Sequence, residues 1–140
     1  MAVVAGSGAL YALYDADDRH HAATRAVLEG ERGTIVIPTA ILGELDYLLR
    51  EYLGINAELD FLDSVIAGVY SLEDLTDTDL VRCRELIAKY SDLDLGLVDS
   101  AVIATAERLG IDRIFTVDHR DFRTVRSKRG KPFVLLPADA

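Results

Sequence analysis

Three acidic residues, Glu44, Asp99 and Asp118, occupy positions where carboxylates could act together. Asp99 falls in the first turn of an expected helix, 97–110, whose residues are apolar nearly all round, as in a buried helix. An ionised carboxylate there is costly unless the helix N-terminus and a cation compensate it. Asp118 directly follows an expected strand, 113–117. Each position also favours Asp as a plain helix cap or turn residue, so that alternative stays open for either acid alone.

Glu44 belongs to an expected helix over residues 39–53. Ile41, Leu45, Leu48 and Tyr52 form its predicted core stripe, and Glu44 lies on the edge of that stripe, so we expect it to face inward. A buried polar group needs a partner. Glu44 is therefore expected to be either a metal ligand or a structural acid satisfied by hydrogen bonds.

Short apolar strands alternate with helices along the chain. The expected strands are 2–5, 34–37, 68–72, 113–117 and 133–136, and the expected helices are 9–14, 18–29, 39–53, 56–67, 77–90 and 97–110. This alternation predicts an α/β fold, a three-layer α/β/α sandwich with a five-stranded parallel sheet. In such sheets, ligands bind beyond the carboxyl ends of the strands, near a topological switch point. The three acids are therefore expected to converge at that edge, together with Gly6.

Composition narrows the class of protein. The chain has 140 residues, which predicts a single domain over 1–140, and half of the residues are hydrophobic, as in a globular protein. The net charge of −9 argues against a broadly basic surface that coats nucleic acid. No apolar run approaches a membrane span and no signal peptide is visible, so we expect a cytoplasmic protein that does not bind membranes. Cys83 is the only cysteine and is expected to be a buried structural thiol.

Basic residues crowd into one short segment near the C-terminus. The residues are Arg120, Arg123, Arg126, Lys128, Arg129 and Lys131. This segment could bind the phosphates of a nucleic acid, or it could be an ordinary solvated loop. We expect it to lie close to Asp118.

The donor types indicate which metal chemistry is available. The sequence has no Cys/His cluster suited to zinc and no Gly-rich Lys loop for nucleotide phosphates. Carboxylate oxygens suit Mg²⁺ or Mn²⁺. A divalent ion held by carboxylates can activate water and stabilise the charge that develops at a phosphodiester.

Four segments, AVVAGSGALYAL, IPTAILGELDYLL, LGLVDSAVIATAERLG and IFTVDHRDF, together resemble a PIN domain, and more closely a VapC-type toxin of a toxin–antitoxin pair. The resemblance implies an α/β/α sandwich, Mg²⁺- or Mn²⁺-dependent endoribonuclease activity, a homodimer and inhibition by an antitoxin. It assigns metal ligation and catalysis to Glu44, Asp99 and Asp118. Asp121 is a further candidate ligand, for which helix capping is an equally good explanation. Thr116 matches a small hydroxyl residue that supports the last acid.

The RNA substrate implied by this resemblance gives the basic segment a role. We expect phosphate contacts from four of its residues, namely Arg123, Arg126, Lys128 and Arg129.

One position departs from the family pattern. The family has an aspartate directly after the first strand, followed by Ser or Thr, and here these places hold Gly6 and Ser7. The next acid, Asp15, lies ~13 Å further along a helix, too far to substitute. We therefore expect a weakened or inactive metal site. The alternative is a non-catalytic PIN-type protein that binds RNA or an antitoxin-like partner. A phosphoacceptor receiver domain is disfavoured, because Lys131 precedes the last strand instead of following it.

Overall fold

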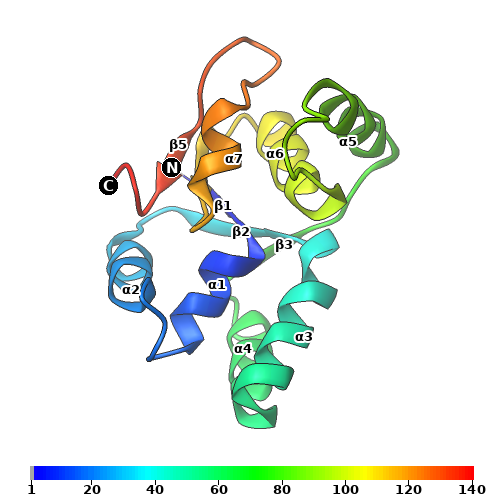
Figure 1. The fold of residues 1–140 in the computed structure, drawn as a ribbon. Coiled ribbons are helices and arrows are strands. Elements are labelled where there is room, and N and C mark those ends of the chain that lie inside the picture. Colours follow the sequence, from blue (N-terminus) through cyan, green and yellow to red (C-terminus); the bar gives the residue numbers. More distant parts are fainter. Residues whose placement is uncertain (1) are drawn as a thin grey trace.

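The computed structural model describes residues 2–140 and forms an α/β fold (Figure 1). Its elements are, in order, β1 (Ala2–Ala5), α1 (Ser7–Tyr14), α2 (His21–Gly30), β2 (Thr34–Pro38), the 3₁₀ turn η1 (Thr39–Ile41), α3 (Leu42–Leu53), α4 (Ile55–Ile66), β3 (Ser71–Glu73), α5 (Asp77–Lys89), α6 (Leu97–Leu109), β4 (Arg113–Phe115), α7 (His119–Thr124) and β5 (Val134–Leu136).

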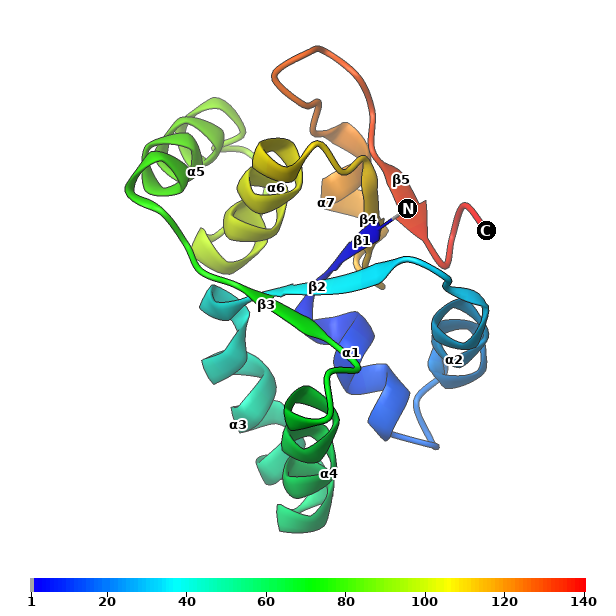
Figure 2. The ribbon, with the colours of Figure 1, turned by 180° about the vertical axis from the view of Figure 1, so that it is seen from behind.

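The five strands form one parallel sheet in the order β3-β2-β1-β4-β5. Helices α1 to α4 cover one face, and α5 and α6 cover the other (Figures 1 and 2). This division follows from right-handed crossovers, because the chain moves outward from β1 to β3 and then returns past β1 to β4. The predicted three-layer α/β/α sandwich with a five-stranded parallel sheet is confirmed. The switch point lies between β1 and β4.

The core is centred on the middle strands and on α6. Val4, Ile37 and Ile114 are fully buried in the sheet, and α6 is buried continuously from Ser100 to Ala106. Helix α6 therefore lies between the sheet and α5, which explains why its sequence is apolar nearly all round. Cys83 on α5 is buried and free, as the sequence predicts. No helix within residues 2–140 is long and apolar enough to cross a membrane.

Several elements differ from the sequence expectation. The strand expected at 113–117 ends at Phe115, and the helix expected at 18–29 begins at His21. The strand expected at 68–72 is the shorter β3, because Gly68 (φ +82°) ends α4 in a left-handed turn and extended chain begins only at Ser71. Helix α7 was not among the expected helices, although helix capping was one explanation considered for Asp121. Phe122 is its only buried residue, and a single apolar side chain among charged ones gives no helical periodicity.

Candidate active site

Backbone hydrogen bonds fix the carboxyl edge of the sheet at the switch point. The N–H of Gly6 donates to the carbonyl of Phe115 at 2.9 Å, which joins the end of β1 to the end of β4. The buried Thr116 follows, and its N–H donates to the carbonyl of Leu136 at 2.8 Å. The Thr116 hydroxyl accepts the N–H of Asp118 at 3.1 Å, so the backbone that carries Asp118 is fixed.

Several helices begin at this same edge, because each runs antiparallel to the strands. Glu44 lies in the first turn of α3, Asp99 in the first turn of α6 and Asp121 in the first turn of α7. Asp118 occupies the position immediately before α7. The free N–H groups and the dipole of a helix N-terminus favour nearby negative charge. The fold thus concentrates carboxylates where helix ends partly offset their charge.

The acids influence one another electrostatically. Burial and, in decreasing order, the negative charges of Asp118, Glu44, Asp121 and Asp94 together raise the pKa of Asp99 to about 6. Residues from three separate segments of the chain therefore act on one half-buried carboxyl group. Asp94 was not predicted as a site residue, because its one sequence signal is its place in the loop that leads into α6.

Glu44 is exposed, so the expectation that it faces inward is wrong. The 3₁₀ turn η1 precedes α3, and the residues that pack inward are Ile41, Leu45 and Leu49, whereas Tyr52 is 65% exposed. The Glu44 carboxylate instead accepts a hydrogen bond from the hydroxyl of the buried Ser7, at 2.5 Å. Ser7 therefore links the start of α1 to the start of α3.

The carboxylate oxygens of Glu44, Asp99 and Asp118 are the groups of this site that could bind a divalent cation. Within residues 2–140, no group of three or more His, Cys, Asp or Glu side chains is arranged to hold a metal ion. The chemistry of the acids still suits such an ion. Glu44, Asp99 and Asp118 form no ion pair with any side chain in the described part of the chain, so their repulsion has no cationic counterpart there. Oxygen ligands of this kind fit Mg²⁺ or Mn²⁺.

Position 6 has room for a side chain. Outside its chain neighbours, a Cβ added at Gly6 would meet only the Phe115 carbonyl oxygen, at the ordinary contact distance of 3.6 Å. The backbone of Gly6 is extended, with φ −92° and ψ 165°, a conformation open to any residue. An aspartate therefore fits at this position without strain.

The basic segment does not stay beside the acids along its whole length, since Arg120 lies in α7 directly after Asp118 but the later residues lie further away. Arg123 forms two hydrogen bonds of 2.8 Å with Asp139, and Arg126 donates to the carbonyl of Arg123 at 2.7 Å. Lys128 and Arg129 line a cavity at the opposite, amino edge of the sheet. The reason is topological, because the chain must return from the end of β4 to the start of β5.

Comparison with known proteins identifies the family. The PIN domain family model matches residues 6–128. The chain is 28% identical over 135 residues to Ribonuclease VapC26 of Mycobacterium tuberculosis, covering 96% of this chain and all of that protein.

Solved structures share the fold. The crystal structure of Mycobacterium tuberculosis VapC20, a Sarcin-Ricin loop cleaving toxin, matches with a TM-score of 0.78 and 18% identity over 85% of this chain and 92% of that one. A toxin–antitoxin complex from Klebsiella pneumoniae matches with a TM-score of 0.69 and 17% identity over 88% and 92%. VapBC2 from Rickettsia felis, bound to a DNA fragment from their promoter, matches with a TM-score of 0.67 and 17% identity over 96% and 97%. The resemblance inferred from the sequence is confirmed: the chain belongs to the PIN domain family and is VapC-like.

Proposed function

We propose that this protein is a metal-dependent endoribonuclease toxin of a toxin–antitoxin pair, with Glu44, Asp99 and Asp118 as its metal-binding and catalytic acids. The observation that carries the proposal is the position of Glu44, Asp99 and Asp118 at helix starts on the carboxyl edge of a PIN fold. Burial and the charges of the other acids raise the pKa of Asp99, in agreement with this placement. Similarity to Ribonuclease VapC26 over 96% of the chain supports the ribonuclease class.

The residues of this chain have distinct roles in that function. Glu44, Asp99 and Asp118 would hold Mg²⁺ or Mn²⁺, with Asp121 as a further carboxylate. The bound ion supplies an activated water and a positive charge that stabilises the developing charge on the phosphodiester. Ser7 orients the Glu44 carboxylate through its hydrogen bond. Thr116 holds the backbone of Asp118 in place.

RNA contacts are proposed for Arg123, Arg126, Lys128 and Arg129. The side chains of Lys128 and Arg129 form no ion pair with residues 2–140, so their charges are available to phosphates. Arg123 would have to exchange its Asp139 partner for a phosphate.

Partner binding is supported by two exposed apolar surfaces. One lies on α3 and α4 and includes Ile55, which is 54% exposed, and Ile66, which is 84% exposed. The other lies on α5 and the start of α6, where Leu80 and Leu97 are about half exposed. Exposed apolar patches of this kind mark protein–protein contact sites. We propose that an antitoxin and a second copy of the chain are the two partners.

A second candidate function rests on Gly6. Without a carboxylate at that position, the protein would be a non-catalytic PIN-type module that binds RNA or an antitoxin-like partner. The space around Gly6 shows that the fold itself does not require glycine there.

The test compares the protein and its Gly6→Asp variant on a mixed single-stranded RNA, with Mg²⁺ or Mn²⁺ and with EDTA. The enzyme proposal predicts metal-dependent cleavage by the variant and weak or no cleavage by the unmodified protein. Absence of cleavage by both proteins, with RNA or antitoxin binding retained, would establish the non-catalytic function instead.

A further inference from the structure

A cavity of about 540 Å³ lies at the amino edge of the sheet, on the side opposite the acids. It is enclosed by the start of α5, the end of α6 and the segment 127–133. Its volume falls in the range of small-molecule sites, roughly 300 to 1,000 Å³. Part of its surface is apolar, contributed by Ala104, Ile111, Pro132 and Phe133.

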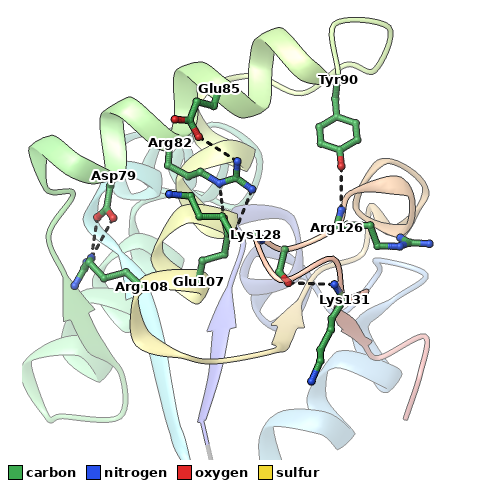
Figure 3. A network of polar contacts seen from close by, with 10 residues as sticks. Asp79, Arg82, Glu85, Tyr90, Glu107, Arg108, Arg126, Lys128 and Lys131 are labelled. Carbon is green, nitrogen blue, oxygen red and sulfur yellow. Dashed lines mark hydrogen bonds and ion pairs between the residues drawn. The ribbon is translucent and has the colours of Figure 1, made fainter.

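Two acids of the cavity wall are neutralised by arginines within the wall (Figure 3). Arg82 donates to both carboxylate oxygens of Glu107, at 2.9 and 3.2 Å. Arg108 donates to both oxygens of the buried Asp79 at 3.1 Å. Burial raises the pKa of Asp79, but hydrogen bonds from Thr76 and Arg108 outweigh it and lower the pKa below its ordinary value, so this acid is ionised and paired.

The remaining charge of the cavity is positive. Lys128, Arg129 and Lys131 line it and form no ion pair with any residue of 2–140, and they face a single unpaired acid, Asp112. This is an unusual feature in a protein with a net charge of −9. A concave site with excess positive charge attracts anions strongly.

The loop that carries these cations is held in a defined shape. The Lys128 N–H donates to the Glu107 carboxylate at 2.6 Å, which ties the loop to α6. The N–H of Ser127 donates to the Lys131 carbonyl at 2.9 Å, and Gly130 takes the left-handed conformation (φ +76°) that the tight turn requires. One closed turn therefore carries all three cations, and its backbone is held before a ligand binds, which lowers the entropy lost on binding.

We propose that this amino-edge cavity binds a nucleotide, with its phosphate at Lys128, Arg129 and Lys131 and its flat ring against Ile111 and Phe133. The cations would bind the phosphate, and the apolar surface would contact the ring. A purely anionic ligand would leave that apolar surface without a contact. The nucleotide is either a free mononucleotide or the phosphorylated end of an RNA strand. The lining residues of α6 begin at Ala104, about 7.5 Å along the helix from Asp99, and none of the proposed catalytic acids lines the cavity. The proposal shares Lys128 and Arg129 with the proposed RNA contacts, but it does not rest on the proposed ribonuclease activity.

The test is a titration of the ¹⁵N-labelled full chain, followed by amide chemical shifts, in EDTA so that the acids hold no metal. The probes are adenosine monophosphate, inorganic phosphate, and a short RNA with either a 5′-phosphate or a 5′-hydroxyl. Adenosine monophosphate should shift the amides of Ala104, Ile111, Lys128 and Phe133 and leave those of Gly6 and Asp99 unchanged. It should bind more tightly than inorganic phosphate.

A charge-matched pair of variants tests the assignment. The triple variant Lys128→Ala, Arg129→Ala, Lys131→Ala should weaken adenosine monophosphate binding roughly tenfold or more. The control variant, Arg19→Ala, Arg25→Ala, Arg32→Ala, removes the same charge from another part of the surface and should leave binding unchanged.

The RNA arms separate the two sources of the nucleotide. A strand end as ligand predicts that the 5′-phosphorylated RNA, and not the 5′-hydroxyl RNA, gives the same amide shifts as adenosine monophosphate. A free nucleotide as ligand predicts shifts from adenosine monophosphate only. Equal binding by the two triple variants would overturn the proposal, as would inorganic phosphate binding as tightly as adenosine monophosphate.

Discussion

Replacing Gly6 with aspartate should create a tighter metal site without disturbing the fold. Gly6 has extended backbone angles and a neighbour no closer than 3.6 Å to an added Cβ. It is also the N-cap of α1, which has no side-chain cap hydrogen bond at present. Asp is a better N-cap than Gly by a few tenths of a kcal/mol, which offsets part of the added repulsion from the other acids. The metal-free variant should therefore unfold within about 1 kcal/mol of the unmodified protein.

The gain in metal affinity follows from one added charge at the centre of the site. Two unit charges 4 Å apart interact by about 4 kcal/mol at an effective dielectric constant of 20, and a ligand oxygen lies closer than that to a divalent ion. Part of this energy is lost in removing water from the ion and the carboxylate. If about 3 kcal/mol remains, affinity for Mn²⁺ rises about a hundredfold, at ~1.4 kcal/mol per tenfold.

The assay is isothermal titration of Mn²⁺ into the protein and into its variants. Gly6→Asn is the matched control, because it has the size of aspartate without the charge and should leave affinity near that of the unmodified protein. Gly30→Asp adds the same charge on α2, where nothing lies within 4 Å of the added Cβ, and should also have no effect. Equal Mn²⁺ affinities of Gly6→Asp and Gly6→Asn would refute the prediction that the added charge binds the ion.

Three further predictions concern charge in the rest of the molecule. The folded chain holds the Asp99 proton more tightly than the unfolded chain, so the free energy of unfolding falls as pH rises from 3.8 to about 6. Above that pH, metal-free Asp99→Asn should be more stable than the unmodified protein by roughly 1 to 3 kcal/mol. Thermal unfolding across pH tests this, and identical pH profiles for the two proteins would contradict it. Asp79→Ala breaks the capping box with Thr76 and the buried ion pair with Arg108, so it should lower the free energy of unfolding measured in urea by roughly 2 to 3 kcal/mol. The control Arg25→Ala breaks an exposed ion pair and should change this free energy by less than about 0.5 kcal/mol. Alanine at all four proposed RNA-contact residues, Arg123, Arg126, Lys128 and Arg129, should weaken RNA binding. The slope of log affinity against log salt concentration should become shallower by ~0.7 per lost phosphate contact, and an unchanged slope would count against this assignment.

The sequence was most informative where one periodicity dominates a segment. Helix α6 and the strands β1 and β2 were predicted within a residue or two, because continuous apolar runs have few alternative explanations. The place of Asp118 at the carboxyl edge followed from strand order alone. Helix α7 was missed because Phe122 is its only buried residue, and one apolar side chain gives no helical periodicity.

Side-chain direction was less predictable than position. Glu44 was placed on the correct helix and edge, but its exposure depends on the 3₁₀ turn before α3, which shifts the buried stripe. The expectation that the basic segment lies close to Asp118 is wrong for Lys128 and Arg129, because the sequence does not show how far a loop travels between two parallel strands. The pairing of Arg123 with Asp139 is likewise a tertiary contact without a local signal.

The most direct test of the proposed function is cleavage of a mixed single-stranded RNA by Gly6→Asp and by the double variant Gly6→Asp, Asp99→Asn, each with Mn²⁺ and with EDTA. Asp92→Asn in the Gly6→Asp background is the control, since Asp92 is an exposed acid in the loop before α6. If the protein is a metal-dependent ribonuclease, Gly6→Asp and the control should cleave the RNA with Mn²⁺ and not with EDTA. The double variant should not cleave it under either condition. Cleavage by Gly6→Asp that persists in EDTA, or that survives the loss of the Asp99 charge, would contradict the proposed function.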